Sequence, residues 1–290
     1  MDNSTVSNSA FKNGESKVRA VMIDIIIALL PAVIAATVFF KLKALILIAT
    51  CVGTAVISEA VFNLICKKKQ TIYDLSAVVT GLLLSLSLST TATIWQCVVG
   101  SVFAIVIVKC AFGGLGYNFA NPSVAAKVMI IMAFGAAAVG NNGSLPSVID
   151  MLVANRYGLL GDACVVALVV GGVYLLIRRV ISWHTPVFYI AGVFLFTLAL
   201  TQNVNIALYN TLSGGLILGA IFMATDPVTS PKKGLGKIVF ALLCAVLTVL
   251  IRLYGANSDG ATFFAILLMN VLCPYVDAIF ERKNKEEVAK

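Results

Sequence analysis

Charged residues are scarce in this chain of 290 residues. Asp, Glu, Lys and Arg together make up 12% of it, whereas hydrophobic residues make up 60%. Soluble globular domains usually carry about 25% charged residues. An ordinary soluble domain is therefore excluded.

The sequence also lacks the residue clusters that hold redox metals. It has one histidine, and its seven cysteines include no C-x-x-C pair. Haem and iron–sulfur centres need histidine or grouped cysteine ligands, so we expect no metal site in this chain. The cysteines lie in or beside apolar runs, which is typical of small buried packing residues.

A cleavable signal is missing as well. The first 17 residues are polar and do not have a basic stretch followed by an apolar one, so we expect the first apolar segment to remain in the mature protein. The formal net charge is +8, but the basic residues stand in short clusters between apolar runs. That pattern indicates orientation in a lipid bilayer and not binding of nucleic acid.

Long apolar runs occupy most of the chain. A bilayer core about 30 Å thick needs roughly 20 apolar residues per helix. Ten segments meet this description, and the third and eighth are the shortest. They are 18–40, 42–66, 74–89, 92–112, 122–140, 161–182, 186–204, 207–224, 234–254 and 261–281. The predicted fold class is an all-α polytopic membrane protein.

The basic residues fix the expected orientation. If the N-terminus lies inside, 17 of the 21 Lys and Arg residues fall on the tails and the even-numbered loops. The four that remain outside are Lys41, Lys43, Arg156 and Arg252. Cytoplasmic loops carry an excess of Lys and Arg, so we expect a multi-pass protein of the cell membrane with both termini in the cytoplasm.

An internal repeat is visible when the two short segments are compared. The sequence TGLLLSLSLST, from Thr80, resembles GGLILGAIFMATD, from Gly214. Each is followed by a turn, a long apolar run and a Gly-rich break. The offset between the copies is about 134 residues at the short segment and 142 at the break.

The repeat predicts the domain organisation. Five spans in each half is an odd number, so the halves must have opposite orientations in the membrane. We expect one ten-helix domain, 18–281, built from two inverted repeats, about 18–140 and 161–281, with polar cytoplasmic tails at 1–17 and 282–290. Inverted repeats place binding sites near the midplane, where interrupted helices expose backbone groups.

Two polar segments are candidate sites. The Gly-rich break (112–122) reads FGGLGYNFANP, in which Gly113, Gly114 and Gly116 let the backbone bend, and Asn118 and Asn121 can satisfy freed backbone groups. It follows no strand of a βαβ unit, so a nucleotide-binding fingerprint is not supported. In TDPVTSP, Asp226 can accept hydrogen bonds from the N–H groups beyond it. This segment is either a rigid cytoplasmic turn or a contact with a cofactor or a partner subunit.

Carboxylates within apolar segments are candidates for ion coupling. Placing an ionisable group at bilayer depth costs at least about 2.5–3.5 kcal/mol. Asp24 and Glu59 are the deepest. Each is either a structural carboxylate, hydrogen-bonded near an interface, or a group whose charge follows the occupancy of Na⁺ or H⁺.

Five ordered motifs resemble a known family. DLSAVVTGLLLSLSLS, FGGLGYNFANPSVAAK, RRVISWHTPV, LSGGLILGAIFMATDPVTSP and SDGATFFAILLMNVLCPYVD are similar to the RnfD subunit of the Rnf ion-translocating electron-transport complex. A more distant resemblance is to the NqrB subunit of the sodium-pumping NADH:quinone reductase. The resemblance covers about 24–277. It implies an inverted-repeat, urea-channel-like subunit that carries flavin, within a complex that couples electron flow between ferredoxin and NAD to movement of Na⁺ or H⁺.

The resemblance has one departure. The family typically attaches FMN to a Thr of a Ser-Gly-Ala-Thr-like motif in the outer loop after the fifth span, but the loop 141–160 of this chain contains no Thr. The Gly260-Ala261-Thr262 run stands in the other outer loop, without Ser or Thr before the glycine, and leaves Thr262 as the candidate for covalent FMN. Flavin bound without a covalent bond, FMN or riboflavin, and a subunit without the outer flavin are the alternatives.

The sequence therefore supports a redox subunit that works with other membrane and peripheral subunits and is not a complete enzyme alone. No residue is assigned as catalytic. The alternatives are a small-solute channel or transporter of the same architecture without redox chemistry, and an assembly scaffold.

Overall fold

The computed structural model describes residues 15–135, 147–153, 158–255 and 260–288. The predictions for the start of the first tail and for parts of the loop 141–160 lie outside these residues. Within them the chain is helical and forms no strand beyond an isolated bridge between Ser89 and Leu159. The predicted all-α membrane class is confirmed.

The helices follow the predicted segments closely. In the first half they are α2 (Glu15–Ile65), η1 (Ile72–Asp74), α3 (Ser76–Leu86), α4 (Ile94–Val102), the π-helical η2 (Phe103–Cys110) and α5 (Pro122–Phe134). In the second half they are α6 (Val148–Val153), η3 (Gly161–Ala163), α7 (Val165–Ile177), α8 (His184–Thr201), α9 (Val204–Leu212), α10 (Leu216–Leu218), the π-helical η4 (Gly219–Met223), α11 (Gly234–Tyr254) and α12 (Ala261–Val288). The expected C-terminal tail, 282–290, continues α12 as far as Val288.

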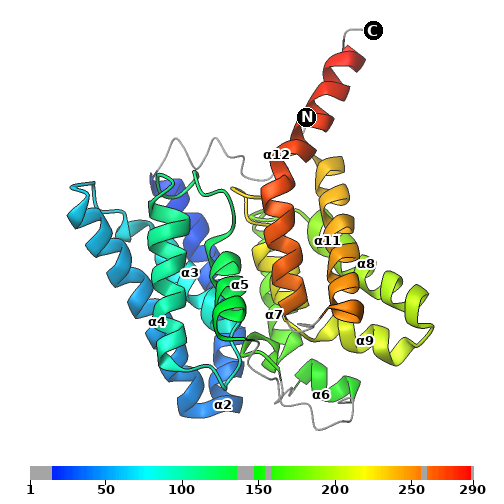
Figure 1. Cartoon of the computed structure of the whole chain (residues 1–290), viewed down its shortest axis with the longest axis horizontal. Helices are drawn as coiled ribbons and strands as arrows, with labels where there is room; N and C mark the ends of the chain where they lie inside the picture. Colours follow the sequence, from blue (N-terminus) through cyan, green and yellow to red (C-terminus); the bar gives the residue numbers. More distant parts are fainter. Residues whose placement is uncertain (1–14, 136–146, 154–157, 256–259, 289–290) are drawn as a thin grey trace.

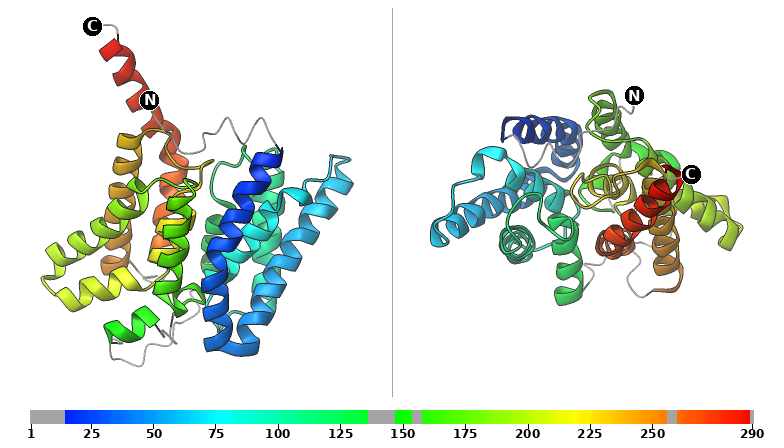
Figure 2. Two further views of the ribbon diagram at one scale, coloured as in Figure 1. Left: turned by 180° about the vertical axis from the view of Figure 1, so that it is seen from behind. Right: turned by 90° about the horizontal axis from the view of Figure 1, so that it is seen from above.

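Helix α2 consists of two arms joined at a sharp kink. Lys41 has φ 53° and ψ −134°, which is not helical. Figure 1 and the left view of Figure 2 show the arms side by side, joined at the lower end of the molecule. The kink falls at the predicted boundary between the first two segments.

Four of the described helices are long and apolar enough to cross a membrane. They are α2, with its two arms counted together as one helix, α8, α11 and α12. The pair formed by α9 with α10 and η4 gives a fifth when it is counted as one span, and it is bent by 57°. Four shorter apolar helices fill the other predicted segments. Each of the ten segments thus contains a helix, while ten crossings and the inverted repeat stay predictions.

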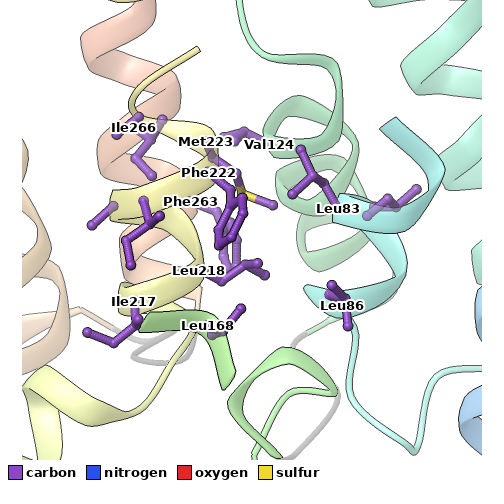
Figure 3. Close-up of a cluster of buried hydrophobic side chains, with 14 of the residues drawn as sticks. Leu83, Leu86, Val124, Leu168, Ile217, Leu218, Phe222, Met223, Phe263 and Ile266 are labelled. Carbon is purple, nitrogen blue, oxygen red and sulfur yellow. The ribbon is translucent and has the colours of Figure 1, made fainter. Parts of the chain in front are cut away.

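The two halves of the chain lie side by side, as the view from above in Figure 2 shows. Helix α2 packs against α7, and α5 packs against α12. A buried apolar cluster forms the core between the halves (Figure 3). Leu83 and Val124 from the first half meet Phe222, Met223 and residues of α12 there.

The start of α2 and the far end of α12 lie at the same end of the molecule, opposite the kink of α2 and helix α6 (Figure 1). The turn between η4 and α11 lies at this same end, next to the Gly-rich break. The polar segments that the sequence singled out are therefore gathered on one side.

Candidate functional site

The Gly-rich break bends as its glycines predict. Gly113, Gly114 and Gly116 have φ of 115°, 95° and 93°, a region that side chains with a Cβ rarely adopt. A Cβ on Gly114 or Gly116 would meet nothing within 4 Å, so the requirement is conformational and not one of space. The break turns the chain from η2 into α5.

Helix α5 starts with a side-chain cap. The Oδ1 atom of Asn121 accepts hydrogen bonds from the backbone N–H groups of Ser123 and Val124, at 3.0 and 3.4 Å. Pro122 occupies the first helical position, where its missing N–H costs nothing. The predicted role of Asn121 in satisfying backbone groups at the break is confirmed.

A pocket lies between the two halves beside the break. It encloses about 700 Å³, counting the part open to solvent, and apolar side chains of both halves form most of its wall. Three predicted site residues line it: Asn118, Asn121 and Asp226. The three glycines shape the break and are not part of the lining, whereas Leu115 between them is.

Asp226 joins the halves across this pocket. Its Oδ1 accepts from the backbone N–H of Val228 at 3.0 Å, as the sequence predicts, and its Oδ2 accepts from Asn121 Nδ2 at 3.3 Å. Asn270 of α12, which the sequence analysis did not single out, accepts from the Asn121 N–H and donates to the carbonyl of Thr229. Burial raises the pKa of Asp226 from 3.8 to about 6.

Asn118 offers an acceptor to the pocket. Its Nδ2 donates to the carbonyl of Ala120 at 3.0 Å, while its Oδ1 is buried without a hydrogen-bond partner. A buried polar atom left without a partner costs about 1–3 kcal/mol, so such an atom in a pocket wall is suited to a ligand that donates an N–H or O–H.

Glu59 belongs to a buried ion pair. Lys109 Nζ lies 2.7 Å from Glu59 Oε1, and the two side chains are 2% and 1% exposed. Lys109 Nζ also donates to Ser76 Oγ at 2.5 Å. The exposed Thr71 donates its hydroxyl to Glu59 Oε1, likewise at 2.5 Å. Glu59 Oε2 has no hydrogen-bond partner. Because Lys109 and Ser76 also line the pocket, this pair forms part of its wall.

Sequence reasoning took Lys109 only as an orienting charge and missed Ser76 and Thr71. The available signal for Lys109 was its position as the one charge in the run FAIVIVKCAF, directly before the break. Lysine is almost never fully buried unless it is paired, so a lysine that the fold buries in such a run indicates a carboxylate partner.

Asp24 has a different environment. Its carboxylate accepts from Tyr174 Oη at 2.9 Å and from Arg178 Nε at 3.2 Å, on and directly after α7. The Arg178 side chain is 56% exposed, so this ion pair reaches the surface. The geometry is that of a link between α2 and α7.

Thr262 lies at the other end of α12 from the pocket side. It is fully buried; its Oγ1 donates to the carbonyl of Gly214 at 3.1 Å and accepts from Arg252 Nη2 at 3.0 Å. Arg252 also donates to the carbonyls of Asn210 and Ser213, where α9 ends and the chain bends into α10. The candidate for covalent FMN is thus engaged in internal hydrogen bonds and does not line the pocket.

Comparisons with known proteins agree with the resemblance. Residues 5–286 match the family described as NQR2, RnfD, RnfE. The D subunit of the Na(+)-translocating ferredoxin:NAD(+) oxidoreductase complex of Acetobacterium woodii is 39% identical, over 99% of this chain and 95% of its own. The D subunit of the proton-translocating ferredoxin:NAD(+) oxidoreductase complex of Clostridium ljungdahlii is 32% identical over 94% and 93%. The D subunit of the ion-translocating oxidoreductase complex of Methanosarcina acetivorans is 35% identical over 87% and 86%.

Proposed function

The chain belongs to the NQR2, RnfD, RnfE family, and from that premise we propose that it is a membrane subunit of an ion-translocating ferredoxin:NAD(+) oxidoreductase complex. The observation that carries the proposal is the match over nearly the whole chain to relatives named for this complex. The subunit works in the cell membrane with other membrane and peripheral subunits, which supply and remove electrons.

We further propose that the pocket between the halves holds a flavin, FMN or riboflavin, without a covalent bond. Apolar walls from Leu83, Leu115 and Phe222 suit a flat ring system, with a few polar groups among them, as is usual for small-molecule sites. Asn118 Oδ1 would accept from a ring N–H. Asn121, from the same half as Asn118, would hold the group together with Asp226 from the opposite half. A bound flavin supplies one- and two-electron redox chemistry, which the protein tunes by hydrogen bonds and charge.

Glu59 is the residue that we propose for ion coupling. It is buried, its Oε2 has no hydrogen-bond partner, and a cation or proton there would relieve the cost of burying a carboxylate. Asp24, the other candidate, already has two partners, Tyr174 and Arg178. The relatives are named for both Na⁺ and protons, so the proposal is for a monovalent cation.

Flavin content tests the pocket. We expect a purified native complex to show flavin absorbance, and Asn118→Leu to lower its flavin content at least threefold, because the variant removes the acceptor and fills space. Ser101→Ala is the matched control, since Ser101 Oγ is likewise buried without a partner but lies outside the pocket lining.

Denatured protein, separated on a gel, should show no flavin fluorescence, since no Thr stands in the loop 141–160. Flavin content that stays normal in Asn118→Leu would place the flavin elsewhere. A fluorescent denatured band that disappears in Thr262→Ala would establish a covalent site at Thr262.

A further inference from the structure

The side chain of Lys109 belongs both to the ion pair with Glu59 and to the wall of the pocket. Its ammonium group pairs with Glu59 Oε1 at 2.7 Å, and the same side chain lines the pocket between the halves. Glu59 is not part of the pocket lining. Lys109 is therefore the charged group that stands between the carboxylate and whatever occupies the pocket.

Both members of the pair are removed from water. Lys109 is 2% exposed and Glu59 is 1% exposed, and charges in such surroundings interact much more strongly than at a surface. The buried pair is neutral as it stands. Adding a charge on either side of it is costly unless an opposite charge is added on the other side.

One carboxylate oxygen of Glu59 has no hydrogen-bond partner. Its Oε1 already accepts from Lys109 and Thr71, whereas its Oε2 is buried with no partner. Thr71 is exposed in the loop after α2, so a single hydrogen bond separates Glu59 from the surface. Oε2 is thus the carboxylate oxygen of Glu59 that is left without a partner.

The other charges around the pair come from several elements. Asp74 of η1 accepts from Ser76 Oγ at 2.5 Å, and Ser76 in turn accepts from Lys109. Asp226 stands in the wall of the same pocket, and Lys68 follows α2 in the loop. None of these forms an ion pair with Glu59, so Lys109 is its direct partner among the described residues.

We propose that Lys109 links cation occupancy at Glu59 to negative charge in the pocket. With Glu59 bare, the carboxylate neutralises Lys109. With a cation on Oε2, the charge of Lys109 is free to stabilise an added electron in the pocket. Linkage is reciprocal, so an electron in the pocket increases cation affinity at Glu59 by the same factor.

The step balances in charge and atoms. One electron arrives from a one-electron carrier of a partner subunit, and one monovalent cation enters at Glu59 from the surface beside Thr71. The net charge of the buried cluster is unchanged. No covalent bond forms when the cation is Na⁺; when it is a proton, one O–H bond forms at Oε2. This inference rests on the proposed redox function of the pocket and names the residue that connects it to the ion site.

The first test measures cation binding without any redox readout. The native complex is unfolded by heat across a series of Na⁺ concentrations at fixed pH, and across a pH series at fixed Na⁺, which separates the two cations. In Lys109→Met, no lysine competes with the cation for the Glu59 carboxylate. We therefore expect the cation concentration that gives half of the maximal protection against thermal unfolding to fall at least tenfold. Lys109→Arg should stay within threefold of wild type. Glu59→Gln should abolish the stabilisation by Na⁺ and leave only the pH dependence that Asp226 contributes.

Lys127→Met is the matched control. Lys127 is also a buried lysine, but it lies over the Phe263 ring, outside the pocket lining. We expect it to leave the half-protecting concentration unchanged. Equal cation affinity in wild type and Lys109→Met would overturn the proposal.

The second test measures the midpoint potential of the bound flavin against cation concentration. In wild type we expect the potential to rise with the cation, by up to about 59 mV per tenfold for one electron and one cation. In Lys109→Met the midpoint potential should be lower than in wild type and independent of the cation concentration. If this variant fails to fold, the double variant Glu59→Gln/Lys109→Met, which leaves no charge unpaired, should give a cation-independent potential.

A cation dependence that persists without Lys109 would refute the link. A complex with no flavin would refute the flavin proposal instead, and the cation-binding measurement would then decide the role of Lys109 by itself.

Discussion

At the scale of single residues, burial separates the two candidate carboxylates. Glu59 is enclosed with a buried lysine and keeps one oxygen without a partner, whereas Asp24 shares its charge with an Arg178 that reaches the surface. Exposed ion pairs contribute about 0–1 kcal/mol, while breaking a buried pair costs about 3–5 kcal/mol. The apolar position of each residue in the sequence could not distinguish them, because their partners lie far away in the chain.

The carboxyl group of Asp226 makes the free energy of unfolding depend on pH. Its pKa is raised from 3.8 to about 6 in the folded protein, so the folded state holds the proton more tightly than the unfolded chain. Stability from this group is fully present below about pH 3.8 and is lost as the pH rises through about 6. We expect Asp226→Asn to gain about 1 kcal/mol relative to wild type between pH 5 and pH 7.

Thermal unfolding of the purified protein at both pH values measures this gain. Asp150→Asn is the control, since Asp150 is exposed and bonds to Ser147. A difference between Asp226→Asn and wild type that does not change with pH would show that Asp226 is ionised without penalty.

At the scale of elements, the apolar runs predicted the helices well. The boundary at Lys41 and the short third helix, α3, appear where the sequence places them. The bend between α9 and α10 was not predicted, because the segment 207–224 was taken as one apolar run although Asn210, Thr211 and Ser213 precede Gly214 and Gly215. Both have positive φ, 63° and 68°, and the carbonyls freed nearby are bonded by Arg252.

Close packing of α7 against α2 depends on a glycine. A Cβ on Gly171 would lie 2.0 Å from the carbonyl oxygen of Ala28, which is backbone and cannot move aside. We expect Gly171→Ala to lower the yield of folded protein at least fivefold. Gly53→Ala is the control: Gly53 lies within α2 with nothing within 4 Å of its Cβ position, so alanine should raise stability by about 0.5–1 kcal/mol.

Size-exclusion profiles and thermal unfolding in detergent compare the two variants. A Gly171→Ala protein as stable as Gly53→Ala would mean that the two helices are not in this contact.

At the scale of the whole molecule, the site lies where the two halves meet. The sequence predicted Asn118, Asn121 and Asp226 because they are polar residues at breaks in apolar runs, and the structure brings these three to one pocket. It could not predict Lys109 or Asn270 as their neighbours, since contacts between halves depend on packing. Nor could it show that the glycines shape the pocket without lining it.

Each half of the chain has a basic residue that bonds to the segment before a short helix. Lys109 lies near the end of η2 and bonds to Ser76 at the start of α3; Arg252 lies near the end of α11 and bonds to Ser213 and Gly214 before α10. The two cations are 143 positions apart, close to the offset of the Gly-rich breaks. An inverted repeat would place them toward opposite sides of the membrane.

Orientation in the membrane is testable by labelling. From the distribution of 17 inside and four outside basic residues, we expect reporters at Asn3 and Lys290 in the cytoplasm and one at Asn142 outside. Single-cysteine variants and a membrane-impermeant thiol reagent on intact cells measure this. Labelling at residue 3 or 290 in intact cells, or protection at 142 until lysis, would reverse the orientation.

The most direct test of the account compares ion uptake with electron transfer in vesicles that contain the native complex. Reduced ferredoxin drives NAD reduction, and uptake of Na⁺ or H⁺ is recorded at the same time. We expect the Glu59→Gln complex that assembles to take up at least threefold fewer ions per electron, while Asp24→Asn has the smaller effect. An unchanged ratio in Glu59→Gln would contradict the account and leave Glu59 as a structural carboxylate.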